Sequence, residues 1–161
     1  YLVMKPFQDF RRIDERYTKH LQTIFNDAGV GDRLVVLDPF PSAGDLMGLL
    51  CLADVQLDTY PFGGWTTNLE ALYYHLPIVT QIGDLARSRW GAKMLEALGV
   101  QEGIATNEAE YVAWAIKLGR DGKLRAKVRK QIADHVEKVL FNPQSGQVEF
   151  ENFLQSIAKF S

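Results

Sequence analysis

The sequence has little cysteine, no long apolar run and no large excess of charge of one sign. Its single cysteine, Cys51, excludes an intrachain disulfide and any metal site built from several cysteines. No apolar run approaches the roughly 20 residues that cross a bilayer, and no signal-peptide pattern opens the chain. The formal net charge is −2 without a cluster of lysines or arginines, so we expect no nucleic-acid partner. These features favour a cytoplasmic protein that does not insert into membranes.

The composition is that of a globular domain. Of the 161 residues, 47% are hydrophobic and 24% are charged, which provides for one sizeable core. We therefore expect a single domain over residues 1–161. Because the chain opens at Tyr1 inside a segment that already has the pattern of a strand, we also expect it to be a piece of a longer protein.

Short apolar runs alternate with amphipathic segments through the first two thirds of the chain. The runs predict strands over residues 1–7, 33–37, 52–58, 76–80 and 103–105. The amphipathic segments predict helices over residues 9–28 and 45–52, from residue 67, and over 84–98. This alternation predicts an α/β fold, a Rossmann-like parallel sheet with helices on both faces.

The period changes beyond Thr106, where residues 107–161 are expected to form an all-helical C-terminal tail. Its three predicted helices cover residues 107–118, 121–140 and 145–160. The last is apolar over much of its surface, and such a helix needs a surface to pack against.

The segment 58–70 (DTYPFGGWTTNLE) is the most informative one, because it joins a predicted strand to a predicted helix through a glycine turn. Gly63 and Gly64 lack Cβ atoms, so their backbone can turn sharply and admit a ligand closely. The helix that follows opens with unpaired N–H groups and the positive end of its dipole, which favour phosphate. Thr66 and Thr67 add hydroxyl donors there. Glu70, one turn later, can accept from the two hydroxyls of a ribose.

A purely structural interpretation of the same residues stays open. Thr67 and Glu70 have the spacing of a capping box, in which Thr67 caps the helix and Glu70 reaches back to the cap's own N–H. Trp65 and Tyr60 either stack on a sugar or wall the turn. The strands on both sides favour the ligand site, because ligands of open parallel sheets bind beyond the carboxyl ends of strands.

With these residues in view, the chain resembles the C-terminal nucleotide-sugar half of the family that contains O-GlcNAc transferases, SPINDLY-type proteins and bacterial adhesin N-glucosyltransferases. The resemblance runs collinearly from about Arg33 to the end. Its most specific parts are LADVQLDT at 52–59, GWTT at 64–67, PIVT at 77–80, Gly83 with Ser88 and Arg89, Ile104 with Ala105, Glu110 with Tyr111, and LFN at 140–142. The YPFG segment at 60–63 is closer to the N-glucosyltransferase branch.

The resemblance implies a GT-B architecture, in which two Rossmann-like domains face each other across a cleft and this chain is most of the second. In that family the threonine pair holds the diphosphate of a UDP-sugar, which implies this role for Thr66 and Thr67. The acidic residue four positions after the first threonine contacts ribose, which implies this role for Glu70. The predicted donor-binding residues are Gly63, Gly64, Trp65, Thr66, Thr67, Asn68 and Glu70, with no metal and no other cofactor.

The chain departs from the family pattern at several positions. O-GlcNAc transferases have histidine where this chain has Trp65 and aspartate where it has Glu70. Ala43 and Leu46 replace a basic residue and a histidine that the family often has, so the uracil pocket must be built differently, for instance from backbone at residues 40–43. A lysine that neutralises the diphosphate aligns upstream of Tyr1. The catalytic base and the acceptor site belong to the other half of the enzyme and are not located here.

Other polar residues give weaker signals. Arg89 is a candidate for the diphosphate by its match to the family, and Arg87 lies beside it, with salt bridging inside the domain as the alternative. The three histidines share no spacing with a nucleophile or a second ligand, and His75 is expected to close the helix before Pro77. Asp54 and Asp58 do not have the pattern of a glycosidase carboxylate pair.

The sequence therefore predicts the donor-binding half of an inverting glycosyltransferase that transfers a hexose or N-acetylhexosamine from a UDP-sugar to a protein side chain. The acceptor would be a protein or peptide bound through the other half, and the isolated chain is expected to be inactive. Two alternatives stay open. One is another GT-B enzyme, such as a UDP-sugar epimerase or a lipid- or small-molecule glycosyltransferase, and the other is a non-catalytic nucleotide-sugar-binding or interaction module.

Overall fold

The computed structural model describes residues 1–4, 11–38 and 42–158, and these divide into two compact units, Tyr1–Leu46 and Met47–Ser161. In the first unit, β1 (Leu2–Met4) pairs in parallel with β2 (Leu34–Val36), with Leu2 opposite Leu34. Helix α1 (Arg11–Asp27) and the 3-10 turn η1 (Gly31–Arg33) connect the two strands. Gly29 has φ +70°, the left-handed conformation that ends helices, as the sequence predicted.

The second unit is built on a three-stranded parallel sheet in the order β3-β4-β5. Its strands are β3 (Gln56–Leu57), β4 (Ile78–Gln81) and β5 (Ile104–Ala105), with Gln56 opposite Ile78 and Thr80 opposite Ile104. The central strand β4 is buried from Ile78 to Thr80. This burial on both faces is why its sequence is a continuous apolar run rather than an alternating one.

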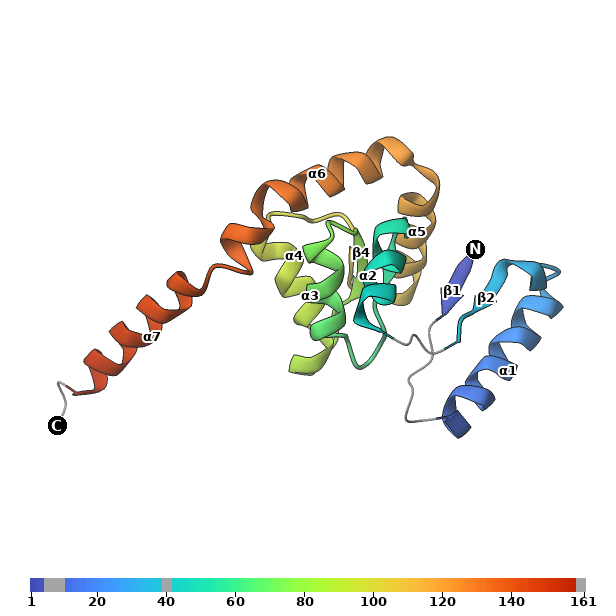
Figure 1. Cartoon of the computed structure of the whole chain (residues 1–161), viewed down its shortest axis with the longest axis horizontal. Helices are drawn as coiled ribbons and strands as arrows, with labels where there is room; N and C mark the ends of the chain where they lie inside the picture. The colour runs from blue at the N-terminus through green and yellow to red at the C-terminus, as the bar shows by residue number, and fades with distance from the viewer. Residues whose placement is uncertain (5–10, 39–41, 159–161) are drawn as a thin grey trace. The chain divides into compact units, whose positions relative to one another are not determined.

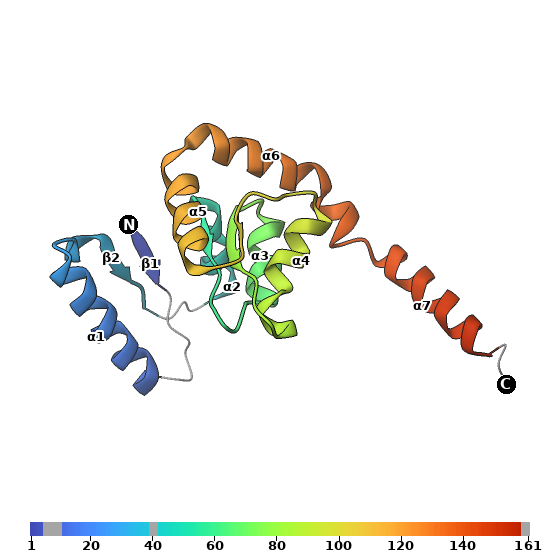
Figure 2. The same cartoon turned by 180° about the vertical axis from the view of Figure 1, so that it is seen from behind.

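Helices cover both faces of this sheet. Helices α3 (Thr66–Tyr73) and α4 (Trp90–Ala97) lie on one side of β4 and α5 (Glu108–Arg120) on the other, as Figure 1 and its reverse view in Figure 2 show. Helix α6 (Gly122–Val139) packs against α3 and α5 and buries Val128, Ile132 and Val136. The chain continues in α7 (Pro143–Ala158), and α2 (Ala43–Leu52) precedes β3.

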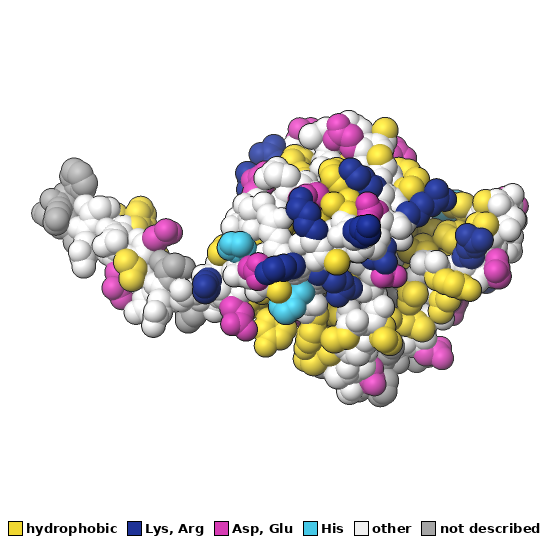
Figure 3. All heavy atoms as spheres, turned by 90° about the horizontal axis from the view of Figure 1, so that it is seen from above, with side chains coloured by type: hydrophobic (Ala, Val, Ile, Leu, Met, Phe, Trp, Pro, Cys, Tyr) yellow, Lys and Arg dark blue, Asp and Glu magenta, His cyan; other side chains and the backbone are white. Residues whose placement is uncertain are grey.

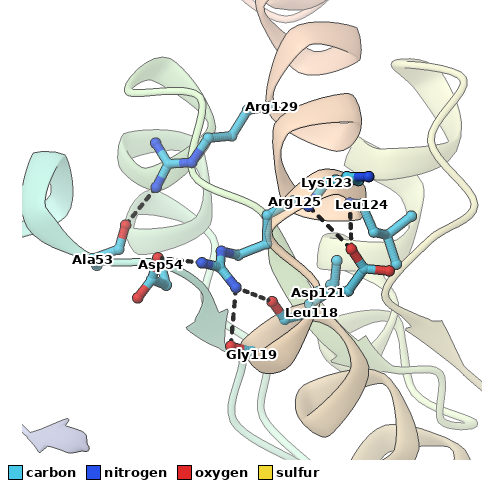
Figure 4. A network of polar contacts seen from close by, with 9 residues as sticks. All are labelled: Ala53, Asp54, Leu118, Gly119, Asp121, Lys123, Leu124, Arg125 and Arg129. Carbon is cyan, nitrogen blue, oxygen red and sulfur yellow. Dashed lines mark hydrogen bonds and ion pairs between the residues drawn. The ribbon is translucent and has the colours of Figure 1, made fainter.

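Two arginines of α6 hold the loop that leads into β3 (Figure 4). Arg129 donates to the carbonyl of Ala53, and Arg125 forms an ion pair with Asp54 at 3.1 Å. Arg125 also donates to the carbonyls of Leu118 and Gly119, each at 2.9 Å, where α5 ends. Those carbonyls lack partners within α5, so one guanidinium satisfies the end of one helix and fixes the start of a strand.

The predicted α/β class with parallel strands and a helical C-terminal tail is confirmed, and most predicted elements form. Several boundaries differ from the prediction. The strand predicted over 52–58 is only β3, because Leu52 ends α2 and Ala53 and Asp54 form a loop. The helix predicted over 84–98 is split into the 3-10 turn η2 (Ala86–Ser88) and α4. Helix α3 begins one residue early, at Thr66.

Some predictions lie outside the described residues: the end of the first strand, the start of the first long helix, residues 40 and 41 of the expected uracil backbone and the end of the last helix. The single-domain prediction for residues 1–161 stays a prediction. His75 does close α3, in the left-handed region at φ 59°.

The surface of the second unit is mixed in charge. Figure 3, which looks onto α6, shows Lys and Arg side chains interspersed with Asp and Glu. On α7 the exposed apolar side chains are Val148, Phe150, Phe153, Leu154 and Ile157. Within the described residues, none of the helices is both long enough and apolar enough to cross a membrane.

Candidate functional site

The backbone N–H groups of the glycine turn, Gly63 and Gly64, bind neighbouring groups of the protein. The N–H of Gly63 donates to the carbonyl of Arg87 at 3.0 Å, and the N–H of Gly64 donates to Asp58 Oδ1 at 2.8 Å. A Cβ on Gly63 would lie 3.0 Å from Asp58 Oδ2, and one on Gly64 would lie 2.0 Å from Thr67 Oγ1. Glycine is needed here because the neighbouring groups approach closely. The space that we expected a ligand to use at these residues is filled by Asp58, Arg87 and Thr67.

Helix α3 opens directly after this turn. Trp65 is its N-cap residue and has no side-chain capping bond. Because the helix starts at Thr66, the N–H groups of Thr66, Thr67 and Asn68 have no carbonyl one turn earlier within it to bind. The side chains of Thr66 and Thr67 are exposed. A helix start of this kind, with N–H groups and two hydroxyls, is suited to an anion.

The capping-box alternative is wrong for α3. Thr67 lies inside the first turn rather than at the cap, and the structure shows no bond from Glu70 back to an N-cap N–H. Within the described part of the chain, the Glu70 side chain makes no hydrogen bond or ion pair. Its carboxylate is partly exposed and keeps its capacity to accept hydrogen bonds.

The side chain of Asn68 points into the protein. It is fully buried, and its Oδ1 accepts from Gln56 Nε2 at 2.6 Å. Its Nδ2 makes no hydrogen bond to any described group. Asn68 is one of the predicted donor-binding residues. Because its side chain is buried, it can offer a ligand only its backbone N–H.

Aromatic rings gather around the turn. Trp90, the first residue of α4, contacts Phe62 and Trp65 edge to face, with ring centroids 5.9 and 5.4 Å apart. Phe62 and Trp65 are nevertheless 60% and 52% exposed. Tyr60 lies against Gly83, where a Cβ would be 3.0 Å from its ring. Trp65 therefore packs against Trp90 while about half of its surface stays exposed, so both of the predicted roles fit. The role of Trp90 was not predicted, because no sequence signal relates it to Phe62 and Trp65, 28 and 25 positions earlier.

The guanidinium of Arg89 is engaged with backbone. Its Nε donates to the carbonyl of Gly83 at 2.7 Å, and one Nη donates to that of Asp84 at 3.0 Å. Among the described residues Arg89 forms no salt bridge, and its role toward a diphosphate stays a prediction. A diphosphate would have to share Arg89 with these carbonyls, whereas the side chain of Arg87 is exposed.

A hollow of about 370 Å³ lies at the carboxyl ends of β3 and β4, next to the start of α5. Its lining residues are Asp58, Tyr60, Gln81, Glu108, Tyr111 and Val112. The start of α5 is well capped, because Asn107 accepts from the N–H of Glu110 at 2.9 Å. The backbone N–H and hydroxyl of Thr106 both donate to the Glu110 carboxylate at 2.8 Å, and these bonds lower the pKa of Glu110.

Comparison with known proteins gives a consistent result. Glycosyl transferase family 41 matches residues 10–149. The chain is similar to the probable UDP-N-acetylglucosamine–peptide N-acetylglucosaminyltransferase SPINDLY of Solanum lycopersicum, with 33% identity over 113 residues, 70% of this chain and 12% of the relative. It is also similar to the UDP-N-acetylglucosamine–peptide N-acetylglucosaminyltransferase of Caenorhabditis elegans, with 40% identity over 81 residues, 50% of this chain and 7% of the relative.

A mutant of the Thermobaculum terrenum O-GlcNAc transferase has a similar solved structure. The TM-score is 0.75 at 34% identity, and the match covers 86% of this chain and 27% of that one. The chain therefore corresponds to a small part of each of these proteins.

Proposed function

The chain belongs to glycosyl transferase family 41, and from that premise we propose that it forms the donor-binding part of an inverting protein glycosyltransferase. The donor would be a UDP-sugar carrying glucose or N-acetylglucosamine, and the acceptor a protein side chain. The SPINDLY and Caenorhabditis elegans relatives are named as peptide N-acetylglucosaminyltransferases, the former as a probable one. These names support a protein acceptor and favour N-acetylglucosamine as the transferred sugar.

The observation that carries the proposal is the open start of α3 after β3. The N–H groups of Thr66, Thr67 and Asn68, with the hydroxyls of Thr66 and Thr67, would bind the diphosphate. Breaking the bond between sugar and phosphate leaves negative charge on that diphosphate. Oriented donors stabilise such charge where it develops, and losing one well-placed donor costs about 3 kcal/mol of transition-state stabilisation. The helix dipole acts in the same direction.

This assignment differs in one respect from the sequence prediction. The N–H groups of Gly63 and Gly64 already donate to the carbonyl of Arg87 and the carboxylate of Asp58. We therefore propose that they shape the turn, and that the phosphate donors begin at Thr66. No metal is needed in this scheme, because the protein's hydrogen-bond donors stabilise the negative charge of the leaving diphosphate. Glu70 would accept from the ribose hydroxyls, and the exposed part of Trp65 would lie against the sugar.

The test is calorimetry of UDP binding to the full-length protein. Thr66→Val and Thr67→Val keep the side-chain shape and remove the hydroxyl, so we expect each to weaken UDP binding about tenfold. Thr23→Val is the matched control, because Thr23 lies in α1 and its hydroxyl donates to the carbonyl of Lys19 in the same helix. If both variants bind UDP as tightly as the T23V control, the diphosphate assignment is wrong.

The alternatives make different predictions. An epimerase would convert the UDP-sugar without any acceptor, and a binding module would bind the UDP-sugar and leave it intact. Incubating the full-length protein with radiolabelled UDP-N-acetylglucosamine or UDP-glucose, with and without acceptor peptides, separates the three. Label transferred to peptide is the outcome that we expect.

A further inference from the structure

A buried polar cluster lies under the glycine turn. Asp58 directly follows β3 and is 6% exposed, and Thr80 and Asn68 beside it are almost fully buried. All three approach Gly91 in α4, where a Cβ would lie 2.7 Å from Thr80 Oγ1, 2.8 Å from Asp58 Oδ2 and 3.0 Å from Asn68 Nδ2. Burying polar groups without hydrogen bonds costs free energy. The hydrogen bonds of this cluster therefore show which parts of the fold it joins.

The Asp58 carboxylate is satisfied entirely by groups of the fold. Oδ1 accepts from the N–H of Gly64 at 2.8 Å and from that of Thr59 at 3.0 Å. Oδ2 accepts from the hydroxyl of Thr80 at 2.8 Å. Bonds to a charged acceptor are among the stronger ones in proteins. The carboxylate therefore joins the turn to the central strand β4.

The backbone of Asp58 is itself fixed in place. Its N–H donates to the carbonyl of Val79 in β4 at 2.8 Å, and its own carbonyl accepts from the Tyr111 hydroxyl at 2.8 Å. The residue is thus attached to β4 and α5, and its side chain holds Gly64 from that base. Gly64 lies only two residues before Thr66, where α3 begins.

We propose that Asp58 is a positioning residue for the donor site, an inference that rests on the proposed function. By holding Gly64, it sets where the first turn of α3 places its N–H groups and hydroxyls. The second anchor is the bond from Gln56 to Asn68 inside that turn. Asp58 does not touch the donor. It acts through Gly64, and misplacing such groups by about 1 Å can lower a reaction rate about a hundredfold.

The experiment compares Asp58→Ala with Asp58→Asn in the full-length protein, by UDP calorimetry and thermal melting. D58A removes the acceptor of Gly64, and we expect UDP affinity to fall at least tenfold at temperatures where the variant is folded. In D58N the amide oxygen still accepts from Gly64 and Thr59, so we expect affinity within about threefold of the wild type. Val100→Ala, a buried site outside the turn, is the control that lowers the melting temperature without changing UDP affinity.

A purely structural role would lower the melting temperature of D58A and leave its UDP affinity unchanged, and that result would overturn the inference. D58N binding as weakly as D58A would overturn it too, since geometry would then not be the cause. If D58A does not fold, Thr80→Val serves instead, because it loses only the Oδ2 donor and should weaken UDP binding about threefold. Unchanged affinity in T80V would then count against the proposal.

Hydrogen exchange separates this inference from the proposed function. The Gly64 amide should exchange slowly in the wild type and quickly in D58A, whether or not UDP is present. Slow exchange of the Gly64 amide in D58A would contradict the inference that Asp58 holds Gly64 in place. Failure of the wild type to bind UDP would instead overturn the proposed function, and the exchange result would stand by itself.

Discussion

At the scale of single residues, the candidate site depends on which polar atoms the fold uses and which it leaves available. The N–H groups of Gly63 and Gly64, the carboxylate of Asp58 and the guanidinium of Arg89 are engaged with groups of the protein. The hydroxyls of Thr66 and Thr67 and the carboxylate of Glu70 make no bond within the described residues. This division places the proposed donor contacts on α3.

The first prediction concerns Glu70. If its carboxylate accepts from ribose hydroxyls, Glu70→Gln should weaken UDP binding about tenfold and leave the melting temperature unchanged, because it loses a charge-assisted acceptor but no internal contact. Repeating the calorimetry with 2′-deoxy-UDP forms a double-mutant cycle. The loss from E70Q should be smaller with the deoxynucleotide. Equal losses for both nucleotides would show that Glu70 does not contact the 2′-hydroxyl.

The second prediction concerns Gly91, which has no room for a side chain. A methyl group there would lie within 3.0 Å of three buried polar atoms, so Gly91→Ala should reduce the free energy of unfolding by about 1–3 kcal/mol in urea titrations. Gly119→Ala in α5 is the matched control, because a Cβ at Gly119 meets nothing within 4 Å. That change should be neutral or stabilising by up to about 1 kcal/mol, since alanine favours helix. Equal effects at both glycines would disprove the packing argument.

At the scale of elements, α6 is the helix that holds the second unit together. It buries three apolar residues against its neighbours and sends Arg125 and Arg129 to the loop before β3 (Figure 4). Strand β3, which Asp58 directly follows, therefore starts from a loop that α6 fixes. The two arginines that fix this loop follow Asp54 and Ala53 by 71 and 76 positions in the chain.

The third prediction tests this dependence. Arg125→Ala removes two bonds to the end of α5 and the pair with Asp54, so we expect a loss of about 1–3 kcal/mol in the free energy of unfolding. Arg125→Lys should recover little of it, because an ammonium cannot reproduce the planar fork. Arg120→Ala, an exposed site, is the control and should change stability by less than about 0.5 kcal/mol. Full recovery by lysine would mean that only the charge matters.

At the scale of the whole molecule, the chain spans 12% of the Solanum lycopersicum SPINDLY relative and 27% of the structurally similar transferase. Transfer of a sugar needs an acceptor site and a catalytic base, and neither is assigned to a residue of this chain. The exposed apolar side chains of α7 are a feature of the described residues that packing within this chain does not explain.

The fourth prediction follows from this scale. We expect a protein of these 161 residues alone to bind UDP weakly and to transfer no sugar, because the expected diphosphate lysine and the acceptor half are not among them. The absence of one charge-assisted contact can weaken binding by roughly ten- to a hundredfold. The measurement is transfer of radiolabelled sugar to peptides by the short chain and by the full-length protein. Similar rates for both would overturn the two-half interpretation.

The sequence by itself determined the α/β class, the order of the elements, and the strand–turn–helix with its threonine pair. These features follow from short-range periodicity, turn residues and helix-end residues, all of which are local in the chain. It also determined the family resemblance, which several separate motifs carry in order. Only the tertiary structure decided which donors remain available. Asp58, Thr80 and Gly91 are 11 to 33 positions apart by their numbers, and their meeting under the turn depends on strand pairing and helix packing. A pattern along the chain does not contain such long-range contacts, which is why the roles of Asp58 and Trp90 were not predicted.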